Sequence, residues 1–205
     1  MKKDGKKYGL CALVLVILTT SCRDDGDGAN REVGDLLSAL PQTVNYPAGN
    51  PYSQEKETLG RLLFWDPLLS GNRDVACASC HHPDLAYADG IALSQGVNGV
   101  GLGNNRTGGV QIIRNAPTII NTAFNGIDNN GNYTPEQAPM FWDSRVNSLE
   151  EQAIKPMLSK DEMRGSAIAE ADIMGIIVGR LSAIAEYQSL FESAFGSNEI
   201  TEQRI

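Results

Sequence analysis

The chain has 205 residues, among them four cysteines and two histidines, and its formal net charge is −8. This length suits one domain, or one domain and part of another. The acidic balance argues against a nucleic-acid-binding protein, because phosphate backbones are bound by clusters of lysine and arginine. The negative charge suits docking on a basic partner protein. It suits equally well a protein in which the charge serves only to maintain solubility.

The N-terminal residues have the order of an export signal. Four lysines precede an apolar run, Leu10–Leu18, that is too short for a comfortable membrane span. The run ends in Leu18-Thr19-Thr20-Ser21-Cys22, which resembles a bacterial lipobox, although threonine replaces the usual leucine at the third position before the cysteine. We predict a lipoprotein signal peptide over residues 1–21 and a lipid anchor on Cys22 of a periplasmic protein. Ordinary cleavage to a soluble periplasmic protein is the alternative.

Residues 22–48 begin with aspartates and glycines, including Asp24, Asp25 and Asp27. This composition is typical of a solvated tether rather than of folded structure. We predict that the tether lets an anchored domain stand away from the membrane, and that the folded domain covers residues 49–205.

The first predicted helix covers Ser53–Trp65. Leu59, Leu62 and Leu63 have the i, i+3, i+4 spacing of one helix face, and Asp66-Pro67 is expected to end the helix. A turn then leads into a second, short helix, which carries the most informative motif of the chain.

Cys77-Ala78-Ser79-Cys80-His81 has the C-x-x-C-H pattern to which a c-type haem is covalently attached. The two thiols add across the two vinyl groups of the porphyrin, and the histidine then reaches the iron from the proximal side. Half of a zinc site is the alternative, but zinc needs four nitrogen or sulfur ligands. The chain has one further histidine, His82, and no second cysteine pair after the predicted signal peptide, so the motif favours haem.

The other two cysteines agree with the same compartment. Cys11 is removed with the predicted signal peptide and Cys22 is lipidated, so no thiol remains for a disulfide in an oxidising compartment. Covalent haem is attached outside the bacterial cytoplasm, which fits export.

Long glycine-rich loops separate the remaining elements. The loop over 89–109 contains seven glycines, and a loop of this length inside a domain is usually functional or disordered. Ser148-Leu149-Glu150-Glu151 is a capping box that starts a helix, and Pro156 is expected to stop it. The other predicted elements are an apolar segment over 118–124, a second loop over 125–139, helices over 169–181 and 187–196, and the start of a helix over 199–205.

Several motifs stand in a fixed order around the haem motif. They are Leu59-Gly60-Arg61-Leu62-Leu63-Phe64-Trp65-Asp66-Pro67-Leu68-Leu69-Ser70 before it, and Ala86-Tyr87-Ala88-Asp89-Gly90, Arg114-Asn115-Ala116-Pro117-Thr118, Phe141-Trp142-Asp143-Ser144-Arg145, Leu149-Glu150-Glu151-Gln152-Ala153 and Glu162-Met163 after it. From about residue 50 onward the chain resembles the N-terminal haem domain of the bacterial di-haem cytochrome c peroxidase family, which includes the methylamine-utilisation di-haem oxidases. The resemblance implies a mainly α, cytochrome c-like helical domain with long loops and one covalent haem.

The family has two haem domains. The resemblance implies that the N-terminal haem meets hydrogen peroxide, that the C-terminal haem transfers electrons, and that calcium lies between the domains. The resemblance also implies that electrons arrive from a small cytochrome c or a copper protein. It leaves undecided whether the protein forms a homodimer. The chain has no second C-x-x-C-H motif and stops where a helix is expected to start, so we expect it to be truncated before the second domain.

The resemblance also assigns roles to single residues. Glu162 matches the glutamate of the distal haem pocket, where a carboxylate takes a proton from one peroxide oxygen and returns it to the other. A solvated charge is the alternative. Gln152 and Pro156 match residues that line this pocket. Trp142 matches a tryptophan between the two haems, and Asn115 matches a ligand of the interdomain calcium.

The number of histidines bears on the iron. His81 is the expected proximal ligand, and His82 adjoins it and cannot easily reach the opposite face. Many family members have a distal histidine in the loop after the haem motif, whereas residues 91–110 of this chain contain none. We therefore predict an iron that is five-coordinate or water-ligated and open to peroxide. A methionine ligand is the alternative, although methionine more often fills a core. The candidates are Met140, Met157, Met163 and Met174.

Together these patterns favour reduction of hydrogen peroxide to water at a c-type haem. A mono-haem electron carrier and a di-haem oxidase acting on another substrate are the alternatives. Turnover needs two electrons and the second haem normally relays one, so we expect this chain by itself to be a poor peroxidase.

Overall fold

The computed structural model describes residues 39–205, so the predicted signal peptide, Cys22 and most of the predicted tether lie outside the described residues. The α-helices of this part are α2 (Gln54–Trp65), α3 (Cys77–Cys80), α4 (Leu149–Leu158), α5 (Glu170–Ser182) and α6 (Ala185–Phe195). Shorter helical turns are η1 (Pro67–Leu69), η2 (Pro83–Leu85), η3 (Gly103–Asn105), η4 (Thr122–Phe124), η5 (Pro135–Gln137), η6 (Lys160–Arg164) and η7 (Glu202–Arg204). Between residues 39 and 205, β-structure is limited to isolated bridges, and no helix has the length and hydrophobicity needed to cross a bilayer. The predicted mainly α class is confirmed.

Helix α2 forms where the leucine spacing predicts it. The Ser53 side chain caps the N-terminus by accepting a hydrogen bond from the Lys56 N–H at 3.1 Å. Leu59 and Leu63 are buried, whereas Leu62 is 44% exposed, so the apolar face is narrower than the spacing indicates. The helix ends before the Asp-Pro pair, because a residue that precedes proline is disfavoured in helical conformation.

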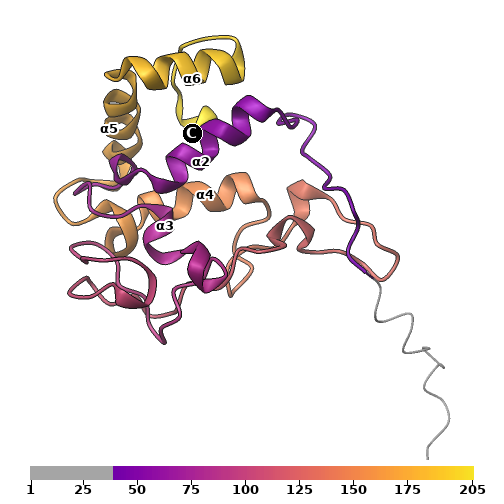
Figure 1. Cartoon of the computed structure of the whole chain (residues 1–205), viewed down its shortest axis with the longest axis horizontal. Helices are drawn as coiled ribbons and strands as arrows, with labels where there is room; N and C mark the ends of the chain where they lie inside the picture. Colours follow the sequence, from indigo (N-terminus) through magenta and orange to yellow (C-terminus); the bar gives the residue numbers. More distant parts are fainter. Residues whose placement is uncertain (1–38) are drawn as a thin grey trace, which may run out of the picture. The chain divides into compact units, whose positions relative to one another are not determined.

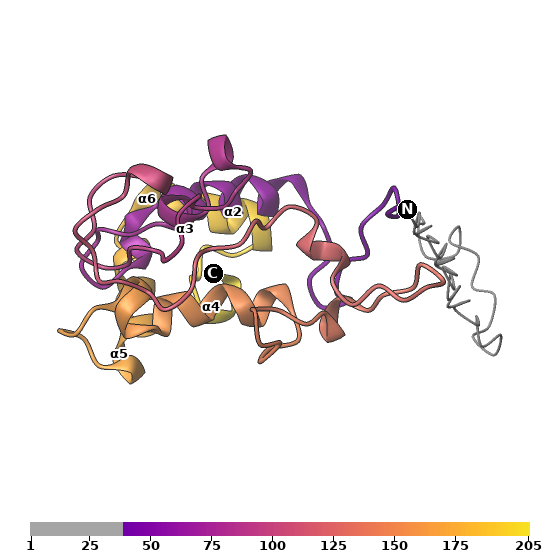
Figure 2. The ribbon, with the colours of Figure 1, turned by 90° about the horizontal axis from the view of Figure 1, so that it is seen from below.

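The core lies where α2, α5 and α6 meet. Figure 1 shows α2 running alongside α6, with α5 leading into α6. Ile173, Ile177 and Leu181 of α5 and Phe191 of α6 are fully buried. Full burial of one such side chain stabilises the fold by about 1.5–3 kcal/mol. Figure 2 shows α2 and α3 on one side of the domain and α4 on the other, so the C-x-x-C-H motif and α4 belong to different layers.

Helix α4 begins as predicted and ends later than predicted. The Ser148 side chain caps it by accepting a hydrogen bond from the Glu151 N–H at 3.1 Å. The predicted stop at Pro156 is wrong, because the helix continues to Leu158. Proline removes one N–H donor, and only two residues follow before Ser159 closes the helix. Packing of α4 against α5 and η6 offsets this local cost.

The chain after α6 is mostly not helical. Gly196 ends α6 in a left-handed conformation with φ of 71°, as predicted. The predicted helix over 199–205 is wrong, because only the single turn η7 is helical there. Ile200 is buried in the core, so burial of this side chain fixes the path of the segment before η7.

Residues 39–48 contact the loop over 125–139. The Asn45 N–H donates to the Tyr133 hydroxyl at 2.5 Å, and this hydroxyl lies 3.3 Å from the Thr43 carbonyl oxygen, to which it donates. Hydrogen bonds therefore join this segment to the folded part of the chain.

Candidate haem site

Cys77 and Cys80 lie one helical turn apart on α3, and both are free thiols. Burial raises the pKa of each thiol to about 11. For Cys80, the Arg106 charge acts in the opposite direction, while the Asp89 and Glu162 charges add to the rise in pKa. Both thiols are therefore protonated at neutral pH, and the i, i+3 spacing places them on one helix face.

His81 follows α3 directly, and a backbone carbonyl orients its ring. The His81 N–H donates to the Cys77 carbonyl at 2.9 Å, which closes the helix. The ring Nδ1 lies 3.0 Å from the Tyr87 carbonyl oxygen. A carbonyl can only accept, so Nδ1 carries the proton and Nε2 keeps the free lone pair. Metal-ligating histidines have this arrangement, in which the hydrogen bond fixes both ring and tautomer.

A tight turn supplies that carbonyl. Ala86 and Tyr87 have left-handed conformations with φ of 54° and 57°, although neither is glycine. The Tyr87 N–H donates to the His82 carbonyl at 2.9 Å, and the His82 N–H donates to the Ala88 carbonyl at 3.2 Å. Strained backbone of this kind clusters at functional sites. The role of Tyr87 was not predicted, because an orienting backbone carbonyl has no residue-type signature.

His82 has partners of its own. Its ring packs edge-on against Trp65, with 5.8 Å between the ring centroids. Its Nδ1 accepts a hydrogen bond from the Asp84 N–H at 3.3 Å, which caps η2. His82 therefore lies just after the end of α3 and serves as the N-cap of η2.

The residues of the motif fit a covalently bound haem. Haem attachment needs two thiols and one imidazole, and Cys77, Cys80 and His81 supply them within five positions. A zinc site would need further ligands close by. Among residues 39–205, no cluster of three or more histidine, cysteine, aspartate or glutamate side chains is arranged to hold a metal ion. The zinc alternative therefore lacks its ligands in this part of the chain.

Glu162 lies on η6, a single π-helical turn that two loops hold in place. The Asp161 carbonyl accepts a hydrogen bond from the Val97 N–H at 3.1 Å, and the Met163 carbonyl accepts one from the Gly71 N–H at 2.8 Å. Turns of this type are frequent at functional sites. The glycine-rich loop and the turn before the haem motif thus fix the position of Glu162.

Gly71→Ala should destabilise the protein, because its Cβ would lie 1.7 Å from the Arg164 carbonyl oxygen of η6. We expect a loss of about 1–3 kcal/mol in the free energy of unfolding. Gly179→Ala is the matched control, since Gly179 lies inside α5 and an added Cβ would meet no atom within 4 Å. It should gain about 0.5–1 kcal/mol. Denaturant unfolding of the haem-loaded protein measures both, and equal values would contradict the close backbone contact.

The surroundings of Glu162 shift the ionisation of its carboxyl. The side chain is half-buried, and burial raises the pKa of its carboxyl. The Arg145 charge lowers this pKa and the Asp161 charge raises it, each less than burial does. The Glu162 charge in turn acts on Cys80, so the carboxyl lies within electrostatic reach of an attachment thiol.

Gln152 and Pro156 lie one turn apart on α4, and both are half-buried. Helix α4 packs against η6, which carries Glu162. The two elements that bear the three residues assigned to the distal pocket by the resemblance are consecutive in the chain, with only Ser159 between them.

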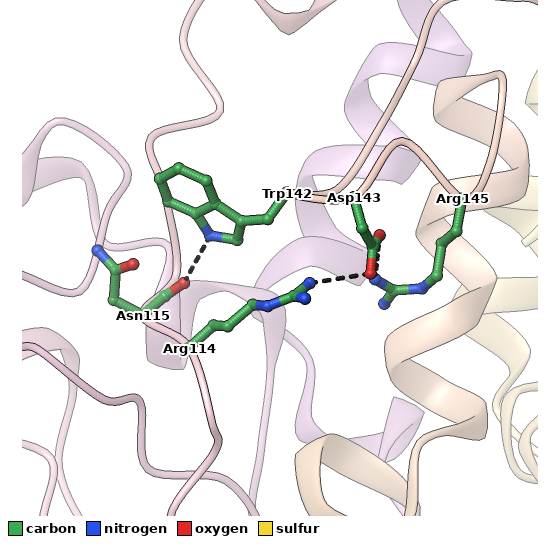
Figure 3. Close-up of polar contacts among 5 residues, drawn as sticks. All are labelled: Arg114, Asn115, Trp142, Asp143 and Arg145. Carbon is green, nitrogen blue, oxygen red and sulfur yellow. Dashed lines mark hydrogen bonds and ion pairs between the residues drawn. The ribbon is translucent and has the colours of Figure 1, made fainter.

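Trp142 and Asn115 belong to a second group of polar contacts (Figure 3). The Trp142 Nε1–H donates to the Asn115 carbonyl at 3.4 Å, and the indole is 62% exposed, so it is not a core residue. Beside it the Asp143 carboxylate accepts hydrogen bonds from Arg114 at 3.0 Å and Arg145 at 2.8 Å. These bonds lower the pKa of Asp143 to about 2. Arg145 connects this set of polar contacts to Glu162, because its charge also lowers the pKa of Glu162.

The methionines considered as iron ligands are all buried in cores. Met157, Met163 and Met174 belong to the main core, and Met140 belongs to a small cluster with Ala138 and Val146. These positions favour core packing over iron ligation.

With the geometry established, comparison with known proteins assigns the family. The family profile described as di-haem cytochrome c peroxidase matches residues 54–205. The chain belongs to the di-haem cytochrome c peroxidase family. It is 36% identical over 175 residues to the methylamine utilization protein MauG of Methylorubrum extorquens, covering 84% of the chain and 41% of that relative. It is 32% identical over 185 residues to the cytochrome-c peroxidase IdrP1 of Pseudomonas sp. strain SCT, covering 90% of the chain and 41% of that relative.

A solved structure supports the same fold. The crystal structure of a MauG-like protein associated with microbial copper homeostasis matches with a TM-score of 0.62 and 31% identity, covering 82% of this chain and 43% of that one. The predicted cytochrome c-like helical fold is confirmed. The chain spans less than half the length of these di-haem cytochrome c peroxidase relatives.

Three charged residues near the site were not predicted: Asp89, Arg106 and Arg145. Asp89 and Arg145 stand in motifs that carry the resemblance, which was a usable signal. Arg106 stands in the glycine-rich loop outside those motifs, and only the folded chain shows that it is buried.

Proposed function

We propose that this chain is the peroxide-binding haem domain of a di-haem cytochrome c peroxidase and serves the reduction of hydrogen peroxide to water. The observation that carries the proposal is the position of Glu162, a half-buried carboxyl within electrostatic reach of the attachment thiol Cys80. Beside that thiol, His81 leaves Nε2 free for an iron ligand bond. Cys80 with His81 would thus provide an iron site, and Glu162 would provide a proton carrier within electrostatic reach of it.

Reduction of peroxide needs both an iron site and a proton carrier. Reduction of one hydrogen peroxide to two waters consumes two electrons and two protons and breaks the O–O bond. A haem bound to the C-x-x-C-H motif would supply the iron at which this bond breaks and the route for the electrons. The Glu162 carboxylate would accept the proton of the near peroxide oxygen and return it to the far oxygen, which leaves as water. The raised pKa of Glu162 favours its gain of that proton. Gln152 and Pro156 would line the same pocket from α4.

We expect the haem-loaded chain to show a high-spin ferric spectrum that changes on addition of peroxide. His82, the second of the two histidines, packs on Trp65, and the four methionine candidates fill cores. Absorption and electron paramagnetic resonance spectra of the purified ferric protein test this. A clean low-spin spectrum, with no response to peroxide, would contradict the open site and favour a mono-haem electron carrier.

An oxidase that acts on another substrate is the second candidate. The 36% identity to the methylamine utilization protein MauG favours it. The full-length protein, assayed both for peroxide reduction with a reduced donor and for peroxide-dependent oxidation of a protein substrate, separates the two activities.

Partners and location complete the proposal. A small cytochrome c or a copper protein would deliver electrons, and a basic face on it would suit the net charge of −8. Asn115 would contribute to a calcium site at the boundary with a second haem domain. Export to the periplasm, anchoring through Cys22 and a homodimer are further proposals. Mass spectrometry of detergent-extracted protein, searched for a lipid on Cys22, tests the anchor.

A further inference from the structure

Arg106 is a buried cation, and its hydrogen-bond partners among residues 39–205 are all backbone carbonyls. It is 4% exposed, and none of the ion pairs found within residues 39–205 includes it. Its guanidinium donates to the carbonyls of Gln95 at 2.7 Å, Gly96 at 2.8 Å, Gly101 at 3.1 Å and Asp74 at 3.3 Å. The carbonyl dipoles satisfy its N–H groups without neutralising its charge.

One oxygen atom joins Arg106 to the attachment cysteine. The Gln95 carbonyl oxygen that accepts from Arg106 Nε also lies 3.9 Å from the Cys80 Sγ. Gly99 leaves room for the guanidinium, because a Cβ there would lie 2.8 Å from Arg106 Nε. In the haem-loaded protein Sγ is bonded to the porphyrin, so a charge beside Sγ is a charge beside the porphyrin edge.

We propose that Arg106 raises the reduction potential of the haem attached through Cys80. Reduction of the iron adds one electron to the haem, so a neighbouring positive charge stabilises the reduced form more than the oxidised form. Burial weakens screening and strengthens this effect. Haem potentials respond to such surroundings as well as to the axial ligands. The proposal rests on the haem site proposed above and makes this haem a better electron acceptor.

Asp89 provides an internal comparison of opposite sign. It is 1% exposed and accepts hydrogen bonds from the Ile91 N–H at 3.3 Å, the Ala116 N–H at 3.1 Å and the Ser94 hydroxyl. Both buried charges act on Cys80, and the Arg106 charge acts more strongly than the Asp89 charge. The field of this pair at the attachment site is therefore dominated by the positive charge.

A spectroscopic redox titration of the haem-loaded chain measures the midpoint potential. Arg106→Gln should lower it, whereas Arg106→Lys keeps the charge and should stay close to the native value. Arg180→Gln is the matched control, because Arg180 also donates to backbone carbonyls and is not among the charges that act on Cys80. Its potential should be unchanged, even if its stability falls.

The proposal would be overturned by an unchanged midpoint potential in Arg106→Gln, or by an equal fall of the potential in Arg106→Lys or Arg180→Gln. Arg106 would then only hold the loops together through its hydrogen bonds. Should Arg106→Gln fail to accumulate, Asp89→Asn decides with the opposite sign. It should raise the potential, and a potential that does not rise would overturn the proposal. Haem staining of the denatured native chain comes first, since absence of covalent haem would refute the proposed haem site itself.

Discussion

Glu162→Gln should lower the rate of peroxide consumption by about 10²–10⁴-fold while the haem stays attached. Glutamine keeps the shape of the side chain but cannot accept a proton and return it, so the variant removes proton transfer with little change in packing. The half-buried position on η6 makes replacement of this carboxylate by bulk water incomplete. Single-turnover stopped-flow mixing of the haem-loaded protein with peroxide measures the rate, and the pyridine haemochrome assay measures the haem content.

Asp161→Asn is the matched control for this experiment. Asp161 is the exposed neighbour of Glu162, and its part in holding η6 is played by its backbone carbonyl, which the variant keeps. Its rate should remain near the native value. Equal losses in the two variants, or native activity in Glu162→Gln, would refute proton transfer by Glu162.

The pH profile adds a second test of the same group. Glu162 must be ionised to accept a proton, and burial raises its pKa from the ordinary value of 4.5. As pH falls through this raised pKa the carboxylate becomes protonated, so the acidic loss of activity should set in above pH 4.5. Arg145→Gln, which removes a charge that lowers the pKa, should move this loss to higher pH, and Asp161→Asn should move it to lower pH.

The helices could be predicted because their signals are local. Ser53 and Ser148 cap the helices that their sequences indicate, and Gly196 ends α6. The two errors have tertiary causes. Pro156 does not stop α4, which packs against α5, and the segment before η7 is extended with Ile200 buried in the core.

Some residues of the site could likewise be predicted from local sequence, and others could not. The cysteines and His81 could be read from spacing, because covalent haem attachment fixes the spacing itself. Glu162 needed the family resemblance, since a carboxylate in a polar stretch has no signal of its own. The places of Tyr87 and Arg106 in the site could not be predicted. Tyr87 orients His81 through its backbone carbonyl, and backbone carbonyls of the loops hold the Arg106 guanidinium, so both depend on how the loops fold.

The double variant Cys77→Ala/Cys80→Ala should retain no covalently attached haem when the chain is exported with the haem-attachment machinery. The two thioether bonds are the covalent link between chain and porphyrin, so their loss leaves at most a dissociable iron ligand from His81. Haem staining after denaturing electrophoresis should be negative for the double variant. Each single variant should keep one thioether bond, which the pyridine haemochrome spectrum distinguishes from two.

Ser79→Ala separates attachment from folding of α3. Ser79 lies between the two cysteines, and its hydroxyl accepts a hydrogen bond from the Ala76 N–H at 3.0 Å. Loss of this hydrogen bond should lower the free energy of unfolding by about 1 kcal/mol. The amount of covalently attached haem should stay the same. The native thiols, with pKa values raised to about 11 by burial, are protonated at neutral pH and poor at disulfide exchange. The spacing of the C-x-x-C-H motif, and not these pKa values, indicates that their proposed chemistry is addition to the porphyrin vinyl groups. A native chain that carried stoichiometric zinc and no haem after such export would contradict this, and with it every role that depends on the haem.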